Sequence, residues 1–230
     1  MRYNALACDY DGTLAADGTV DAPTLAALER LRAAGHPALL VTGRELGDLR
    51  RVCPRLDLFD LVVAENGGLL YHPSTQQAQA LGPPPPAALV GALRARGATP
   101  LGVGRVILAT RVPYDADVRE AIGELGLDLE VIYNKGAVMV LPAGIDKAFG
   151  LRAALRELGM AAHSVVGVGD AENDLAFLSI CGCAVVVANA LPALREHVDL
   201  VMPSPRGAGV AELIERMLAD ELPPPRSKPV

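Results

Sequence analysis

Short apolar runs alternate with amphipathic stretches along most of the chain, and turns containing Gly or Asp separate them. This alternation is typical of β-strands and α-helices that build a parallel sheet. The predicted strands cover residues 4–8, 37–42, 61–64, 164–168 and 184–187, with a hairpin arm at 69–72. The predicted helices cover residues 22–34, 44–52, 146–158, part of 169–180, and 209–219. The pattern therefore predicts the α/β class, with a Rossmann-like parallel-sheet core.

The alternation stops at Gly82 and the four prolines 83–86, which continue neither a helix nor a strand. A separate series of elements follows, with predicted helices at 87–96 and 115–125 and predicted strands at 103–111, 129–134 and 137–141. We therefore predict a discontinuous core, residues 1–82 and 143–221, and a smaller α/β cap domain inserted at 83–142. The proline-rich segment 222–230 is predicted to be a disordered tail, or a linker to a possible fusion or partner domain.

The charge balance limits the partners. The net charge is −6, the pI is about 5.2, and Lys and Arg form no run, so we expect no nucleic-acid partner. A single small phosphate remains compatible with an acidic protein, because a metal ion and a few donors suffice to bind it.

The N-terminus lacks the pattern of a signal peptide, and no apolar stretch reaches the roughly 20 residues that span a bilayer. We therefore predict a cytoplasmic protein without membrane contact. The four cysteines, Cys8, Cys53, Cys181 and Cys183, lack the spacing of a zinc site and are predicted to be buried thiols, although the last two also fit a redox pair. The sequence predicts no oligomeric state.

The run Asp9-Tyr10-Asp11-Gly12-Thr13 directly follows the first predicted strand. It therefore lies at the carboxyl end of the sheet, where open α/β folds bind ligands. Two carboxylates that converge there would repel each other, so we expect a divalent cation. An acidic loop that merely caps a helix is the alternative.

Three further segments carry polar groups at strand ends or helix starts. Thr42, Gly43 and Arg44 follow a strand, where a hydroxyl and backbone amides can bind phosphate oxygens. The segment Gly169-Asp170-Ala171-Glu172-Asn173-Asp174 offers the oxygen ligands that Mg²⁺ prefers, or alternatively a capped helix start. Lys147 begins a helix, where the dipole disfavours a cation, so it is either held by an anion or simply solvated.

The order Asp-x-Asp, Thr, Lys and Gly-Asp-x-x-Asn-Asp across both core segments resembles the haloacid dehalogenase superfamily of phosphohydrolases. The insert lies between the Thr and Lys motifs, which resembles the type-two cap of subfamily IIB. That branch holds Cof-like sugar phosphatases, sucrose phosphatases, archaeal-type phosphoglycolate phosphatases and phosphomannomutases.

The resemblance implies a role for each matching residue. Asp9 would be the nucleophile that forms an aspartyl phosphate, and Asp11 the general acid and base. Mg²⁺ would be held by Asp9, Asp170 and the main-chain carbonyl of Asp11, and Asp174 would bind it directly or through water. Thr42 and Lys147 would bind phosphoryl oxygens. The further candidates for substrate contact are Gly43, Arg44, Asn66, Asn173 and Asn189.

Two of these candidates carry reservations of their own. Asn66-Gly67 also fits an ordinary turn. Asn189 stands in Ala188-Asn189-Ala190, where the family usually has Gly-Asn-Ala, and this departure affects only how closely the backbone can approach.

The expected function is Mg²⁺-dependent hydrolysis of a small phosphorylated metabolite, of the sugar phosphate or phosphoglycolate type. A phosphomutase uses the same phosphoenzyme and is the first alternative, although the insert has few arginines for that role. A regulatory phosphate-sensing domain of a larger protein is the second alternative, suggested by the proline-rich C-terminal segment.

Overall fold

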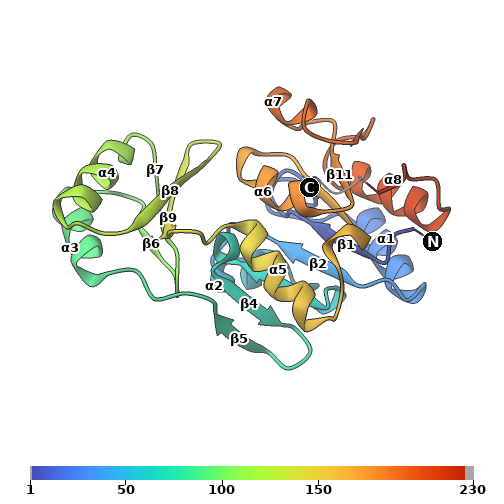
Figure 1. Ribbon diagram of the computed structural model, residues 1–230, viewed down its shortest axis with the longest axis horizontal. Coiled ribbons are helices and arrows are strands. Elements are labelled where there is room, and N and C mark those ends of the chain that lie inside the picture. Colours follow the sequence, from blue (N-terminus) through green and yellow to red (C-terminus); the bar gives the residue numbers. More distant parts are fainter. Residues whose placement is uncertain (1, 226–230) are drawn as a thin grey trace.

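Six parallel strands form most of the larger sheet in the computed structural model, which describes residues 2–225 (Figure 1). In sheet order they are β12 (Leu200–Val201), β11 (Cys183–Val186), β10 (Val165–Gly169), β1 (Ala5–Cys8), β2 (Ala38–Val41) and β3 (Leu61–Ala64). The antiparallel strands β4 (Leu69–His72) and β5 (Gln77–Ala80) extend the sheet beyond β3. The carboxyl ends of β1, β2 and β10 therefore meet at one edge.

Helices cover both faces of this sheet. One face carries α1 (Ala22–Ala33), α2 (Leu46–Val52) and α8 (Arg206–Leu218), and the other carries α5 (Lys147–Glu157) and α6 (Leu175–Ile180). Alternate residues of β1 pack into the two layers, Leu6 and Cys8 into the first and Ala5 and Ala7 into the second. Because both faces are buried, the strands are continuous apolar runs in the sequence. The predicted fold class is confirmed.

The inserted residues 83–142, called the insert below, form a four-stranded antiparallel sheet of their own (Figure 1). Its elements are α3 (Ala87–Ala95), β6 (Gly102–Val103), β7 (Leu108–Arg111), α4 (Asp115–Glu124), β8 (Leu129–Asn134) and β9 (Ala137–Pro142), in the sheet order β6-β7-β9-β8. Both helices pack on one face, where Leu89, Val118 and Val140 are buried together. The opposite face, with Met139, is turned toward the loops that follow β1 and β2 of the core.

Several short elements differ from the prediction. The strand expected at 103–111 is divided into β6 and β7, because the backbone between them turns toward the core. The sequence pattern also missed β5, β12 and α7 (Pro192–Arg195). β5 is the edge strand Gln-Ala-Gln-Ala and is largely exposed, so it carries no apolar run that would reveal it. The short helices η1 (Leu56–Leu58), η2 (Glu65–Gly67), η3 (Ala162–Ser164) and η4 (Glu172–Asp174) complete the chain.

The start of the predicted tail packs against the core. Leu222 is only 3% exposed, and the Tyr3 hydroxyl donates to the carbonyl of Pro223 at 2.7 Å. An apolar side chain and a backbone acceptor thus hold residues that were expected to be disordered. The rest of that prediction, residues 226–230, lies outside the described residues.

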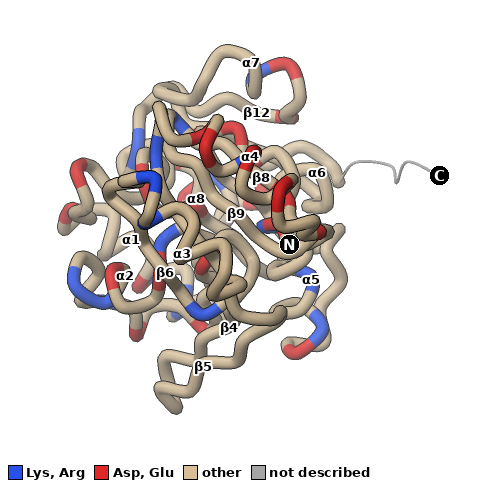
Figure 2. The backbone as a smooth tube through the Cα atoms, turned by 90° about the vertical axis from the view of Figure 1, so that its left-hand side faces the viewer, with Lys and Arg blue, Asp and Glu red and all other residues tan. Residues whose placement is uncertain are grey.

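The distribution of charged residues and the burial of the cysteines agree with what the composition suggested. Viewed from the side of the insert, basic and acidic positions are interspersed (Figure 2). All four cysteines are buried thiols, as predicted. Among residues 2–225, no helix combines the length and the apolar character needed to cross a membrane.

Candidate active site

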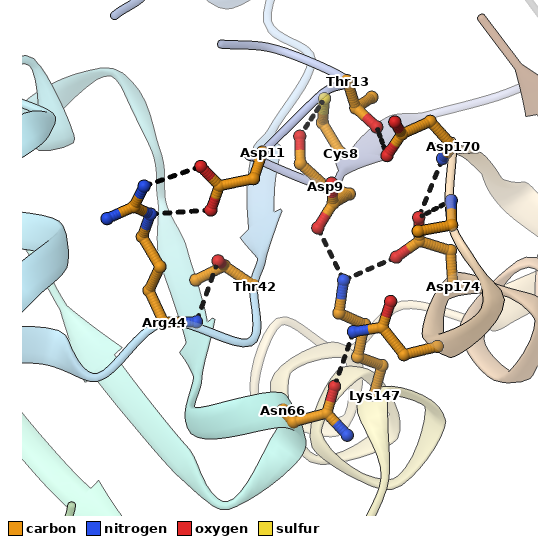
Figure 3. A network of polar contacts seen from close by, with 12 residues as sticks. Cys8, Asp9, Asp11, Thr13, Thr42, Arg44, Asn66, Lys147, Asp170 and Asp174 are labelled. Atoms are coloured by element: carbon orange, nitrogen blue, oxygen red, sulfur yellow. Dashed lines mark hydrogen bonds and ion pairs between the residues drawn. The ribbon is translucent and has the colours of Figure 1, made fainter. Parts of the chain in front are cut away.

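The first catalytic loop leaves β1 and places Asp9 and Asp11 on different sides of one turn. Asp9 is 5% exposed, and its backbone N–H donates to the carbonyl of Val168 on β10, which keeps the two strand ends together. Gly12 has a φ of 85°, a conformation that glycine adopts without strain, and it turns the chain after Asp11. The Asp9 carboxyl consequently points toward the next loop and Asp11 points away from it (Figure 3).

The second loop follows β10 and brings Asp170 and Asp174 beside Asp9, and both side chains are fully buried. One oxygen of Asp174 accepts from the backbone N–H groups of Asp170 and Ala171, at 2.8 and 2.9 Å. The Thr13 hydroxyl donates to Asp170 at 3.1 Å. These bonds fix the loop so that the remaining carboxylate oxygens face Asp9.

Lys147 joins the two loops from the start of α5, on the face of the sheet that also carries α6. It is the first residue of α5, is 1% exposed, and donates to both Asp9 and Asp174 at 2.5 Å (Figure 3). Helix α5 lies close to η2 because Gly67 and Gly150 face each other, and a side chain at either position would collide with backbone. The sequence left open whether Lys147 binds an anion, and in the structure it binds two carboxylates.

Burial and charge perturb the ionisation of this cluster. Burial, followed by the nearby charge of Asp174, raises the pKa of Asp9 to about 7 despite the opposing effect of Lys147. Burial also raises the pKa of Asp170. For Lys147 burial alone would lower the pKa, but the carboxylates of Asp174 and Asp9 outweigh it and the pKa is raised. The Lys147 ammonium is therefore charged, and it offsets only part of the negative charge of the three aspartates.

The three aspartates fit a divalent cation. One carboxylate oxygen from each of Asp9, Asp170 and Asp174 lies within 4.8 Å of the others, and all three side chains are buried. The ammonium of Lys135, from the insert, forms an ion pair with Asp170, so a cation already lies against this cluster. Hard oxygen donors of this kind suit Mg²⁺ or Ca²⁺.

The third strand end carries Thr42, Gly43 and Arg44. Thr42 is 1% exposed, and its hydroxyl accepts from the backbone N–H of Arg44 at 3.2 Å. The Arg44 guanidinium binds both oxygens of Asp11, at 2.6 and 2.7 Å, and also pairs with Asp48. Arg44 thus contacts the predicted general acid, where the sequence suggested a contact with substrate.

A cavity of about 190 Å³ opens over these strand ends. Its core side carries Asp9, Asp11, Thr42, Gly43 and Arg44, and its insert side carries Ala109, Asn134, Ala137 and Met139. The cavity therefore lies between the two sheets.

Comparison with known proteins agrees with this arrangement. Residues 6–81 and 106–214 match the model of the haloacid dehalogenase-like hydrolases. The chain belongs to this family. A phosphoglycolate phosphatase of Methanothermobacter thermautotrophicus is 32% identical over 93% of this chain and 98% of its own length, and that of Halorubrum lacusprofundi is 33% identical over 91% and 95%.

Solved structures show the same fold. A haloacid dehalogenase-like hydrolase from Bacteroides thetaiotaomicron aligns with a TM-score of 0.78 over 94% of this chain and 99% of its own, at 20% identity. A sugar phosphatase of subclass IIB aligns with a TM-score of 0.77 over 93% and 98%, at 17% identity. The predicted family and enzyme class are confirmed.

Two amides that the sequence offered as substrate contacts bind each other in this haloacid dehalogenase-like hydrolase. The Asn173 side-chain N–H₂ donates to the carbonyl oxygen of Asn66 at 2.9 Å, and both side chains are buried. Asn66 has a φ of 52°, so it does form the turn that was the alternative explanation. The pair connects η2 to η4. It lies close to Gly43, since a Cβ added to that glycine would be 3.7 Å from the Asn173 amide nitrogen.

Asn189 lies behind Asp170. Its amide nitrogen donates to the carbonyl of Gly12 at 2.8 Å and to Asp170 at 3.2 Å, and its oxygen accepts from the N–H of Arg206. Asn189 is absent from the described lining of the cavity, so these contacts favour a positioning role over the predicted contact with substrate.

Sequence reasoning missed two residues that connect the core and the insert. Glu65, buried at the start of η2, accepts from the backbone N–H groups of Arg105, Val106 and Ile107 at 2.7–3.1 Å. Lys135 reaches Asp170 from the β8–β9 turn. The signal for Glu65 was an acidic residue directly after an apolar strand, whereas nothing local marks Lys135.

Proposed function

We propose that this chain is a Mg²⁺-dependent phosphohydrolase that cleaves phosphomonoesters of small metabolites through an aspartyl phosphate on Asp9. One observation carries the proposal: Asp9 is buried, paired with Lys147 and adjacent to Asp170 and Asp174, yet it lines the cavity beside Asp11 and Thr42. A carboxylate held in this way is a positioned nucleophile with its charge partly offset.

In the first half-reaction an Asp9 carboxylate oxygen bonds to phosphorus while the bond from phosphorus to the ester oxygen breaks. Asp11 gives a proton to that leaving oxygen. In the second half-reaction Asp11 takes a proton from water, the water oxygen bonds to phosphorus, and the bond to Asp9 breaks. Inorganic phosphate leaves and both carboxyl groups return to their starting states.

Arg44 holds Asp11 in the absence of substrate. Its two hydrogen bonds hold the carboxylate at the rim of the cavity, and Asp48 in turn fixes the guanidinium. Bidentate pairing gives a fixed orientation that a lysine would not provide. Asp11 would turn from Arg44 toward the leaving oxygen when substrate is present.

Asp9, Asp170 and Asp174 would hold the Mg²⁺, directly or through water, and the ion would neutralise charge on the transferring phosphoryl group. Thr42 and the backbone N–H of Gly43 lie at the same strand end and would donate to phosphoryl oxygens. Lys147 would also donate to a phosphoryl oxygen, since its ammonium already lies beside Asp9.

The size of the cavity supports a small substrate. About 190 Å³ is less than the roughly 300–1,000 Å³ of pockets for drug-sized ligands. The relatives that align over nearly the whole chain are named phosphoglycolate phosphatases, so phosphoglycolate is the first compound to try. The insert would act as the cap that encloses the leaving group, because it supplies the second wall of the cavity.

The test is release of inorganic phosphate from 2-phosphoglycolate, a panel of sugar phosphates and p-nitrophenyl phosphate, with Mg²⁺ or EDTA. We expect turnover that requires Mg²⁺ and falls at least about 10³-fold in Asp9→Asn. Asn keeps the shape of Asp9 and an acceptor for Lys147, and circular dichroism would check folding. Turnover that survives in Asp9→Asn would exclude the aspartyl phosphate, and transfer to a second sugar hydroxyl would instead identify a phosphomutase.

A further inference from the structure

The turn between β8 and β9 forms the tip of the insert, and Figure 1 shows this hairpin reaching toward the core. Lys135 has a φ of 47° and Gly136 a φ of 86°, so these two residues make a tight turn between the strands. Lys135 is the only lysine of the insert. The tip therefore presents a single lysine ammonium to the core.

The Lys135 ammonium lies between the loops that follow β1 and β10. It pairs with Asp170, and a Cβ added to Gly12 would lie 3.0 Å from the Lys135 Nζ. The same Asp170 oxygen accepts from the Asn189 amide at 3.2 Å, and the other oxygen accepts from the Thr13 hydroxyl at 3.1 Å. Both oxygens of this buried carboxylate are thus occupied by donors from the chain itself.

This ion pair lies at the end of the insert that is remote from the linkers. β9 runs six residues from Ala137, beside the tip, to Pro142, where the chain returns to the core, a length of about 20 Å. The bond from the Val106 N–H to Glu65 holds the insert near its entrance, since a Cβ added to Gly82 would lie 3.3 Å from a Val106 methyl group. No other ion pair joins insert and core within residues 2–225, so the tip has its own ionic attachment.

A divalent ion bound to the aspartate cluster would need the carboxylate that Lys135 already uses. Asp9, Asp170 and Asp174 offer oxygens that lie within 4.8 Å of one another. Two cations that share one buried carboxylate lie close together and repel each other. The side chain of Lys135 is 41% exposed, so its flexible stem can carry the ammonium into water, whereas Lys147 is 1% exposed and held by two carboxylates.

We propose that Lys135 competes with the divalent ion for Asp170: in the metal-free protein its ammonium pairs with this carboxylate and ties the tip of the insert to the core, and metal binding breaks that tie. The inference rests on the proposed function, which assigns a metal to this cluster. The effect is reciprocal, because the pairing weakens metal binding by the same factor by which the metal weakens the pairing. Asn134 and Ala137 flank the turn and line the cavity, so metal binding would loosen this wall before substrate enters.

The first test measures the dissociation constant of Mg²⁺ by calorimetry on metal-free protein at pH 8, without substrate. Lys135→Met should bind Mg²⁺ at least about fivefold more tightly than wild type. Lys135→Arg keeps a cation for Asp170 and should stay close to wild type. The matched control is Arg94→Met, which removes the same charge from an exposed position on α3, across the insert's sheet from the core, and should change the constant by less than about twofold.

The second test observes the ion pair directly. The chain contains three lysines, so lysine-specific ¹⁵N labelling gives few ammonium signals, and the signal absent from Lys135→Met is that of Lys135. Mg²⁺ should speed the exchange of the Lys135 ammonium protons with water, because the contact with Asp170 is lost. The Arg94→Met protein should show the same acceleration as wild type.

Equal dissociation constants in wild type and Lys135→Met would overturn the inference, and so would Lys135 proton exchange that Mg²⁺ leaves unchanged. An equally large gain in Arg94→Met would also overturn it, because the effect would then be one of overall charge. Failure of the proposed function looks different. Protein that binds no Mg²⁺ with or without Lys135 would refute the metal site itself, whereas Lys135-dependent Mg²⁺ binding without hydrolysis of any ester would support the inference and refute the hydrolase.

Discussion

Lys147 is a buried ammonium at the first residue of a helix, a position that the helix dipole makes unfavourable for a cation. Two aspartates from different loops compensate for that position and for the loss of water. Burying such a group is tolerated only where the partners are complete, so the three side chains depend on one another. The residue that binds phosphate in the proposed mechanism is thus also part of the site's structural support.

Replacing Lys147 with Met should destabilise the metal-free protein by about 3–5 kcal/mol at pH 8, because two buried carboxylates lose their counter-charge. Urea unfolding in EDTA measures this change. The double variant Lys147→Met/Asp174→Asn should recover part of the loss, as coupled partners do. A loss below about 1 kcal/mol would mean that water reaches the cluster and that the pairing contributes little.

The close approach of α5 to η2 fixes the position of Lys147, the first residue of α5. An added Cβ at Gly150 would lie 2.7 Å from the Cα of Gly67 and 2.9 Å from its carbonyl oxygen, distances that backbone atoms relieve only by moving apart. The short segment between Gly104 and Ile107 is held instead by hydrogen bonds from its backbone N–H groups to the Glu65 carboxylate. Both elements are positioned by groups that the apolar pattern does not include.

Gly150→Ala should therefore destabilise the protein by about 1–3 kcal/mol, as overpacking does, and should lower kcat because Lys147 is displaced. Gly91→Ala on α3 is the matched control, since a Cβ there meets nothing within 4 Å. That control should gain about 0.5–1 kcal/mol from better helix propensity and keep its activity. Thermal unfolding and phosphate release would measure both, and equal behaviour of the two variants would contradict the packing argument.

Glu65→Ala should loosen the connection between the core and the insert, because the backbone N–H groups of Arg105, Val106 and Ile107 lose their acceptor. We expect a loss of about 1–3 kcal/mol in stability and faster hydrogen exchange at those amides. Glu130→Ala, an exposed change in β8, is the control and should leave exchange at 105–107 unaltered. Unchanged exchange in Glu65→Ala would show that the insert is held elsewhere.

At the scale of the whole molecule, the acidic cluster at the edge of the larger sheet is removed from water, since Asp9, Asp170 and Asp174 are all buried. The metal-free fold consequently favours protonation, and the pKa of Asp9 is raised to about 7, mainly by burial. A raised pKa stabilises the fold below the group's ordinary value, and that contribution is lost as the pH rises through about 7. A cation binds the ionised form of Asp9. It should therefore stabilise the protein most at pH values above about 7, where the metal-free fold has lost the contribution of the protonated carboxyl.

The increase in melting temperature caused by Mg²⁺ should therefore be larger at pH 8 than at pH 6, where a proton on Asp9 must first be displaced. Differential scanning fluorimetry with Mg²⁺ or EDTA at both pH values measures this difference. Asp9→Asn should remove most of the pH dependence. An equal Mg²⁺ effect at the two pH values would mean that Asp9 is ionised throughout this range.

The central strands of the larger sheet, β1, β2, β3, β10 and β11, were predictable because they are buried on both faces and are therefore apolar throughout. The acidic motifs were equally visible, since Asp9 and Asp170 directly follow such strands. β5 and the division of 103–111 into β6 and β7 were not predictable, because one is an exposed edge and the other results from Glu65 binding backbone far away in the sequence.

The sequence by itself determined the fold class and the strand ends that Asp9, Thr42 and Asp170 follow, because local periodicity and residue type encode them. Only the tertiary structure decided the partner of each side chain. It paired Asp11 with Arg44, turned Asn66 and Asn173 toward each other and brought Lys135 to Asp170. The physical reason is that these contacts join segments far apart in the chain, and their energies depend on burial and distance that no local pattern records.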